Sequence, residues 1–143
     1  MLSWPIVKMT IYIDIVEVHE IHRAIIYSAN TKAIVRDFSL LHSAVERPKA
    51  TYAGRELYPN IFAKAASLLQ SICLNHPFTD GNKRTAWGAT KRFLWLNNYH
   101  LQANIKEAAD FMVNVDNQKP NIVEITGWLK KHCRKKKGKK ELT

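Results

Sequence analysis

The chain has 143 residues, a 46% hydrophobic fraction and a formal net charge of +10, which together predict one globular domain around a single core. No apolar run approaches the roughly 18 residues of a membrane helix. Pro5 and Lys8 interrupt the N-terminal stretch before it resembles a secretory signal. We therefore expect a cytoplasmic protein without a membrane partner, in which Cys73 and Cys133 are reduced thiols rather than a disulfide or a metal site.

Much of the positive charge lies at the C-terminus. Eight of the 22 basic residues fall between Lys130 and Lys140. A run of like charges usually stays solvated, so we expect residues 133–143 to form a disordered basic tail. Residues 10–132 are then the domain, and residues 1–9 are an N-terminal extension. Nucleic acid is a candidate partner only through the tail.

The first half of the chain combines helices with one turn-like segment. Residues 10–13 are β-branched and predicted to be extended, and Asp14 with Glu17 three residues later matches a capping box that starts a helix. That helix should run to about residue 29. A short helix over residues 39–46 should end before Pro48. The turn-like sequence at the centre of residues 48–58 predicts a loop or a small hairpin.

The second half is predicted to be helical throughout. Pro59 can open a helix whose buried face is marked by Ile61, Ala65, Leu68 and Ile72. The next helix should start near Asn82 and be buried centrally, because its side chains are apolar on nearly every face, Trp95 included. Two further helices are expected over residues 105–115 and 122–132. The fold class is therefore all-α, with one short β element.

The loop between the two central helices carries the chemistry. Gly81 and Asn82 stand where a turn enters a helix, and the first free N–H groups of a helix favour an anion. Two cations on that first turn strengthen this cradle for phosphate. A carboxylate just before it suits Mg²⁺ bound to phosphates. A histidine at the start of the loop can accept a proton from a hydroxyl. The two cations are Lys83 and Arg84, the carboxylate is Asp80 and the histidine is His76. Phe78 lies between these polar residues and should anchor the loop in the core.

The segment His76–Arg84 resembles the signature of the Fic/Doc superfamily, specifically its Doc (death on curing) branch, which reads H-x-F-x-D/N-A/G-N-K-R. Every specified position is matched. The resemblance extends over residues 10 to about 132. It implies a compact Fic/Doc-type helical domain with a short β-hairpin flap.

The resemblance also implies roles for the residues. His76 is the general base for a target hydroxyl, and Asp80 binds Mg²⁺ with the phosphates of ATP. Gly81, Asn82, Lys83 and Arg84 form the nucleotide and phosphate site. The flap lies over this site and aligns the target protein as an added strand. Its counterpart in this chain is about residues 49–57, with Thr51, Tyr52, Ala53 and Gly54 at its centre.

Lys83 indicates which group is transferred. Fic proteins that transfer AMP usually read G-N-G-R-x-x-R, whereas this chain has Lys83 at the second glycine and Trp87 at the second arginine. In the Doc branch the lysine pattern accompanies kinase activity, in which the γ-phosphate passes to a threonine of elongation factor Tu and translation stops. Such proteins are toxins silenced by an antitoxin. Related proteins are silenced by an inhibitory helix with an S/T-x-x-x-E motif, whose glutamate competes for the anion site. This chain has no such motif, so we expect the antitoxin to be a separate chain that folds on binding.

Alternatives remain open at this point. A Fic-type AMP transferase would use the same loop. Arg36 and His42 have the spacing of a HEPN-type ribonuclease, a short pattern that often arises by chance. The basic tail is compatible with a nucleic-acid-binding module, and an intact loop is compatible with a role other than that of a toxin.

Overall fold

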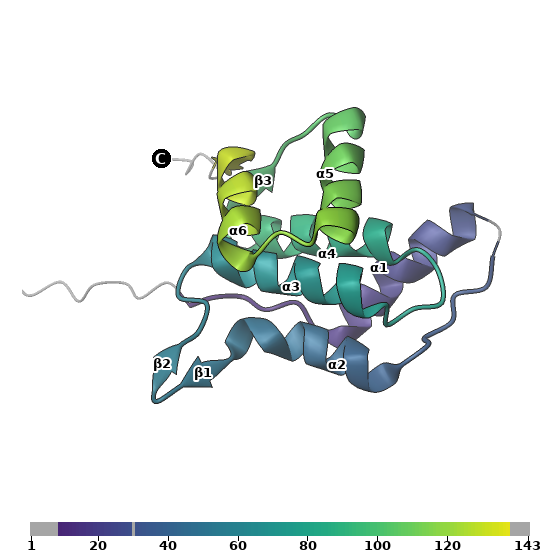
Figure 1. Cartoon of the computed structure of the whole chain (residues 1–143), viewed down its shortest axis with the longest axis horizontal. Helices are drawn as coiled ribbons and strands as arrows, with labels where there is room; N and C mark the ends of the chain where they lie inside the picture. Colours follow the sequence, from purple (N-terminus) through teal and green to yellow (C-terminus); the bar gives the residue numbers. More distant parts are fainter. Residues whose placement is uncertain (1–8, 30, 138–143) are drawn as a thin grey trace, which may run out of the picture.

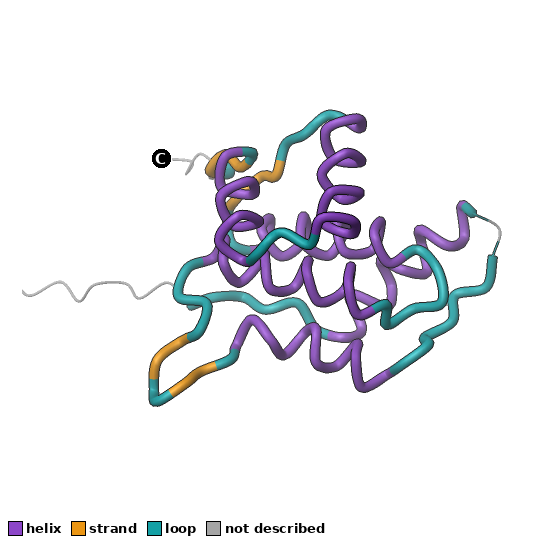
Figure 2. Tube along the Cα trace, viewed as in Figure 1, coloured by secondary structure: helices purple, strands orange, loops and turns teal. Residues whose placement is uncertain are grey.

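A computed structural model describes residues 9–29 and 31–137, which form six α-helices and two small antiparallel sheets (Figures 1 and 2). The helices are α1 (Ile15–Ser28), α2 (Phe38–Glu46), α3 (Ile61–Asn75), α4 (Asn82–Leu96), α5 (Ile105–Gln118) and α6 (Ile122–Lys131). The strands are β1 (Thr51–Tyr52), β2 (Arg55–Glu56), β3 (Tyr99–Leu101) and β4 (Cys133–Lys135). The predicted all-α class with a short hairpin is confirmed.

Helices α3 and α4 form the centre of the fold. They pack side by side, with α1 against α4 and with α2 and α6 against α3 (Figure 1). Burial of one large apolar side chain contributes about 1.5–3 kcal/mol, and this layer contains several: Leu68, Leu69, Ile72, Phe93 and Leu94 are all fully buried. The loop over residues 76–81 therefore joins two rigid elements.

Side-chain caps explain where most helices start. The Asp14 side chain accepts a hydrogen bond of 2.8 Å from the backbone N–H of Glu17, so the predicted start of α1 is confirmed. Pro59 does not open α3. Asn60 is the N-cap instead, since its side chain accepts a bond of 2.8 Å from the N–H of Ala63. A capping side chain accepts a hydrogen bond from an N–H group that has no partner within the helix. Pro59 has no side-chain acceptor and cannot act as this cap.

The predicted hairpin is present as β1 and β2, in which Thr51 pairs with Glu56. Its turn places Ala53 and Gly54 at φ 51° and 77°, as a tight turn of this kind requires. The base of the hairpin is fixed by Lys64 of α3, a buried cation. Its ammonium donates to Glu56 Oε1 at 3.1 Å and to the carbonyl of Tyr58. The hairpin is thereby held at the N-terminal end of α3.

Residues 10–13 belong to no helix or strand, and the Asn97 side chain exchanges two hydrogen bonds of 2.8 Å with the backbone of Ile11. Two local expectations were wrong. Trp95 was expected to be buried with the rest of α4, but it is 41% exposed. The tail does not begin as a disordered segment at residue 133, because residues 133–135 form β4 against β3. Backbone pairing leaves charged side chains free to reach solvent, so the basic sequence did not prevent a strand. Residues 1–8 and 138–143 lie outside the described residues.

The two cysteines, Cys73 and Cys133, are free. Burial, with a contribution from nearby Asp116, raises the pKa of Cys73 to about 11, and burial raises the pKa of Cys133 to about 11. Neither thiol is therefore activated as a nucleophile. Within residues 9–29 and 31–137 no helix is long and apolar enough to cross a membrane.

Candidate active site

The loop between α3 and α4 is anchored by Phe78, which is fully buried, as expected. His76 ends α3 in the left-handed conformation, with φ 49°, so the chain turns sharply out of the helix. The backbone N–H and carbonyl of Phe78 bond to the side chain of Asn82 at 3.0 and 2.9 Å. An apolar anchor and two hydrogen bonds thus fix the loop onto the first residue of α4.

His22 of α1 supports the loop from below. Its ring is fully buried and stacks on Phe78, with ring centres 3.7 Å apart. Nε2 lies 2.8 Å from the carbonyl oxygen of Asp80, to which it donates a hydrogen bond when it carries the hydrogen. Burial lowers the pKa of His22, which favours this neutral ring. No local sequence pattern linked His22 to the loop.

Arg36 also holds the loop in place. Its guanidinium donates to the carbonyls of His76 and Asn75, at 2.6 and 2.8 Å, where a helix C-terminus leaves carbonyls without partners. Its backbone N–H donates to the carbonyl of Pro77 at 2.8 Å. His42, the second residue of the proposed ribonuclease pair, is exposed on α2. The guanidinium is therefore committed to backbone carbonyls, and the ribonuclease interpretation has no structural support.

The N-terminus of α4 forms a candidate anion cradle. The other five described α-helices begin at an Asp or Asn whose side chain bonds to the first turn, whereas α4 begins after Gly81 with no side-chain cap. Its first N–H groups are therefore free for a ligand. They face a pocket of about 340 Å³, lined by His76, Thr79, Asp80, Gly81, Asn82, Lys83 and Arg84. The structure thus brings the predicted loop residues together, with Phe78 beneath them.

Asn82 differs from its expected role. Its side chain is largely buried, and its amide oxygen and nitrogen both bond to the backbone of Phe78. The side chain therefore shapes the loop and is not available as a free phosphate ligand. Its backbone N–H, at the start of α4, remains part of the cradle.

Asp80 is placed to bind a cation at the mouth of the cradle. One carboxylate oxygen accepts the N–H of Gly81 at 2.7 Å, and the exposed side chain leaves the other oxygen free. The described residues contain no cluster of three or more metal-binding side chains. Mg²⁺ is often held by one or two carboxylates, with phosphates and water completing its shell. The site therefore fits a Mg²⁺ ion that arrives with a nucleotide.

Lys83 is paired across the pocket. Its ammonium lies 3.4 Å from Asp116 Oδ2 near the end of α5, and both side chains are partly exposed. Exposed pairs of this kind are weak, so a phosphate can replace Asp116 as the partner. Sequence reasoning missed Asp116, which is separated from the loop by an entire helix.

The His76 side chain is exposed at the edge of the same pocket. Its Nδ1 lies 3.5 Å from the Asn82 amide nitrogen, a separation too long for a strong hydrogen bond that would occupy this ring nitrogen. Either nitrogen can therefore carry the lone pair that accepts a proton.

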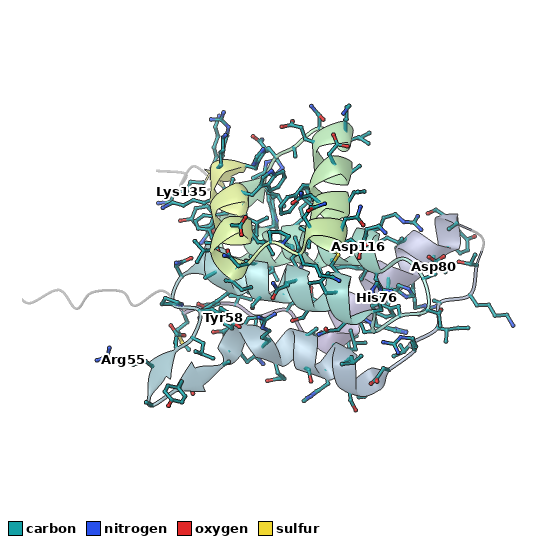
Figure 3. The ribbon with its side chains drawn as sticks, in the orientation of Figure 1. Arg55, Tyr58, His76, Asp80, Asp116 and Lys135 are labelled. Atoms are coloured by element: carbon teal, nitrogen blue, oxygen red, sulfur yellow. The ribbon has the colours of Figure 1, made fainter. Side chains whose placement is uncertain are left out.

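The hairpin does not lie over this pocket. His76 follows the last residue of α3, whereas β1 and β2 precede its first residue, and a helix of 15 residues spans about 22 Å. Figure 3 shows His76 and Asp80 at one end of the molecule and Arg55 at the other. The expectation that Thr51, Tyr52, Ala53 and Gly54 form a flap over the site was wrong, since the contacts of Lys64 hold the hairpin at the far end.

The fold and this loop define a helical domain that presents an anion cradle beside a histidine. The sequence profile of the Fic/DOC family matches residues 12–94, more than half of the chain, and the chain belongs to that family. It is also 49% identical over 83 residues to Toxin Doc of Mycolicibacterium smegmatis. That alignment covers 57% of this chain and 64% of the relative.

The conformation of Gly81 gives a first prediction. Gly81 has φ 79°, and a Cβ there would lie 3.0 Å from Ile26 Cδ1. Gly81→Ala should lower the free energy of unfolding by about 1–2 kcal/mol and impair transfer, measured by denaturant titration and an activity assay. Gly54→Ala is the control, because Gly54 has φ 77° with open space around it. It should be destabilised while keeping activity. Full activity in Gly81→Ala would show that the cradle tolerates a displaced turn.

His22 gives a second prediction. His22→Ala removes the ring beneath Phe78 and the donor to Asp80, so the free energy of unfolding should fall by about 2–4 kcal/mol. His22→Phe keeps the stacking and removes the donor, and should retain most of the stability while lowering the transfer rate. His42→Ala, at an exposed position, should change stability by less than about 0.5 kcal/mol. Wild-type rates in a folded His22→Phe variant would refute a positioning role for this hydrogen bond.

Proposed function

We propose that the chain transfers the γ-phosphate of ATP to a protein hydroxyl and acts as the toxin of a toxin–antitoxin pair. The observation that carries the proposal is the uncapped start of α4 in a pocket bordered by His76, Asp80 and Lys83. These groups offer an acceptor for the hydroxyl proton, a carboxylate for a cation and donors for phosphate. By resemblance, the acceptor is a threonine of elongation factor Tu.

The proposed reaction is an in-line displacement. The target hydroxyl oxygen attacks the γ-phosphorus, and the bond from that phosphorus to the β-phosphate oxygen breaks, releasing ADP. The hydroxyl proton passes to the His76 ring. The N–H groups at the start of α4, with Lys83 and Arg84, hold the phosphates and offset their charge. Asp80 would hold Mg²⁺, which would offset part of the negative charge of the phosphates. Positioning supplies much of the rate in such reactions.

Two side chains support phosphate transfer over AMP transfer. Lys83 places an ammonium at the phosphate pocket where AMP-transferring relatives have glycine, and Asp116 pairs with that ammonium from the α5 side. Trp87 replaces the second arginine of those relatives, and its ring packs edge-on against Trp128 at 5.9 Å. The chain thus lacks a guanidinium at that position, and the ammonium is expected to move the γ-phosphorus into line with the hydroxyl.

The test uses ATP labelled in two positions. The purified chain is incubated with a bacterial lysate, Mg²⁺ and either γ-labelled or α-labelled ATP. Label on a protein from γ-labelled ATP alone supports phosphate transfer. Label from α-labelled ATP assigns AMP transfer, and label from neither contradicts transferase activity in this mixture.

The toxin role rests on the similarity to Toxin Doc. That alignment spans 64% of the relative, so the partners of the relative do not pass to this chain by similarity alone. An antitoxin partner is therefore part of the proposal. Expression of the chain alone in bacteria should slow growth, and His76→Ala should restore it. Unimpaired growth of cells that contain active enzyme at high level would contradict the toxin role.

A further inference from the structure

A second surface lies at the opposite end of α4, on the outer face of the β3–β4 sheet. His100 of β3 pairs directly with Arg134 of β4, and Leu101 pairs with Cys133. Paired residues share a face of the sheet, and successive residues alternate. Leu101 is buried in the core, so His100 and Arg134 lie on the outer face.

Aromatic and cationic side chains meet on this face. The ring of Trp95, from the last turn of α4, meets the His100 ring edge-on with centres 5.5 Å apart. The ammonium of Lys136 lies 4.3 Å from the centre of the Trp95 ring. Gln102 belongs to the same group, since its amide nitrogen is 3.2 Å from His100 Nδ1. The partial exposure of Trp95, unexpected from its helix, places an aromatic ring among cations.

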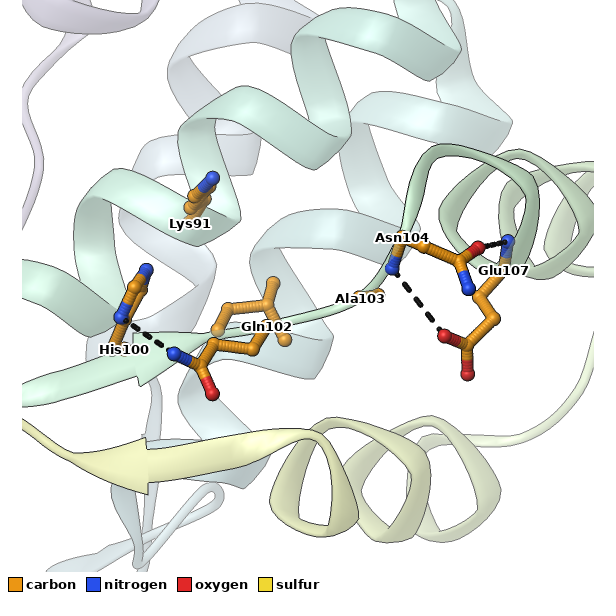
Figure 4. A pocket seen from close by; sticks show the side chains of 7 residues that line it. Lys91, His100, Gln102, Ala103, Asn104 and Glu107 are labelled. Carbon is orange, nitrogen blue, oxygen red and sulfur yellow. Dashed lines mark hydrogen bonds between the residues drawn. The ribbon is translucent and has the colours of Figure 1, made fainter.

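The surface is hollowed on both sides of His100. Two adjoining pockets of about 430 and 380 Å³ share Lys91 and His100. Figure 4 shows Lys91 projecting from α4, His100 from β3 and Gln102 from the residue that follows β3, around the first pocket. The second pocket adds Arg92 and Trp95. The outer face is therefore a shallow, open surface on which a flat ring can lie.

The charge of this surface is largely unbalanced. Among the residues that the structure describes, no carboxylate lies within ion-pair distance of Lys91, Arg134 or Lys136, whereas Arg92 pairs with Glu17 at 3.2 Å. Glu107, the acid that lines the first pocket, is engaged by Asn104 and by His132. Such a field attracts a polyanion.

We propose that the outer face of the β3–β4 sheet binds single-stranded nucleic acid. Lys91, Arg134 and Lys136 supply phosphate contacts. A base stacks on Trp95 once the Lys136 ammonium moves to a phosphate, and the Gln102 amide can bond to a base edge. An aromatic platform flanked by cations is the usual means of binding unpaired strands. An anionic membrane or an acidic peptide would engage the charges but would not require the Trp95 ring.

This surface is independent of the proposed transferase site. Trp95 lies at the C-terminal end of α4, whereas Lys83 lies at its N-terminal end, so about 18 Å of helix separates them. Failure of one proposal therefore leaves the other intact, and circular dichroism checks the folding of every variant.

The experiment measures binding of a fluorescent single-stranded RNA of about 12 nucleotides by anisotropy over a series of salt concentrations, with a DNA of the same sequence in parallel. A triple variant, Lys91→Gln, Arg134→Gln and Lys136→Gln, should weaken binding more than about 10-fold and reduce the salt slope by about 2. The control triple, Arg23→Gln, Lys32→Gln and Arg55→Gln, removes the same charge elsewhere and should change both quantities little.

Trp95 tests the aromatic part of the proposal. Trp95→Ala should weaken binding about 10-fold, and Trp95→Phe, which keeps a ring, should recover most of the affinity. Equal losses in the two triple variants would overturn the proposal. Unchanged affinity in Trp95→Ala would also overturn it, as would binding of anionic vesicles without binding of either oligonucleotide. Equal affinity for RNA and DNA would assign recognition to bases and phosphates, and preference for RNA would add the 2′-hydroxyl.

Discussion

His76→Ala is expected to reduce transfer of phosphate to the target protein by about 10²–10⁴-fold, the usual loss when a positioned base is removed. His76 is exposed at the edge of the pocket and not packed in the core, so the chain should stay folded. Initial rates with labelled ATP, together with circular dichroism of both proteins, measure the effect.

Two controls make this result specific. His76 occupies the left-handed conformation, which asparagine tolerates better than alanine, so His76→Asn removes the base with less effect on the turn. His42→Ala removes an exposed histidine on α2 and should keep the wild-type rate. Wild-type transfer by a folded His76→Asn variant, with loss in His42→Ala, would overturn the assignment of the base.

Lys83→Gly should lower phosphate transfer by about 10²-fold, because it removes a cation next to the phosphates. Lys83→Gln removes the charge while keeping a good helix former at this position. If the charge is what matters, both variants should be equally slow. The ratio of label retained from γ-labelled and α-labelled ATP reports which phosphorus reacts. We expect Lys83→Gly to gain at most a small AMP-transfer activity, since Trp87 still fills the position of the second arginine.

Asp116→Asn provides the matched test of the pair. Asp116 lies 3.4 Å from the Lys83 ammonium, and its replacement should free that ammonium without removing it. Phosphate transfer should then stay within a few-fold of the wild-type rate. A loss as large as that of Lys83→Gly would show that Asp116 has a further role in the site. Wild-type rates in both Lys83 variants would contradict the assignment of Lys83 to the phosphates.

The sequence predicted the groups of the site because they are local. The residues from His76 to Arg84 are consecutive, and a turn that enters a helix brings them together whatever else the chain does. The start of α1 was also predictable, because a cap depends on Asp14 and the N–H of Glu17 alone. Burial of Phe78 followed from its place between polar residues.

The supporting contacts were not predictable, because they join distant segments. His22 lies 58 residues from Asp80, and Arg36 lies 40 residues from His76. Neither pair has a periodic signature. β4 was missed because its charged residues suggested a solvated tail, whereas strand pairing uses the backbone. The expected position of the flap came from the resemblance, and the length of α3 alone argues against it.

The mass of the modified protein tests the central claim most directly. The protein labelled in the lysate is purified, incubated with unlabelled ATP, Mg²⁺ and the wild-type chain, and measured intact before and after. An increase of about 80 Da, one phosphate, that is absent with His76→Ala is the expected result. An AMP-sized increase would contradict phosphate transfer, and the same increase with a folded His76→Ala variant would contradict the assignment of the reaction to this loop.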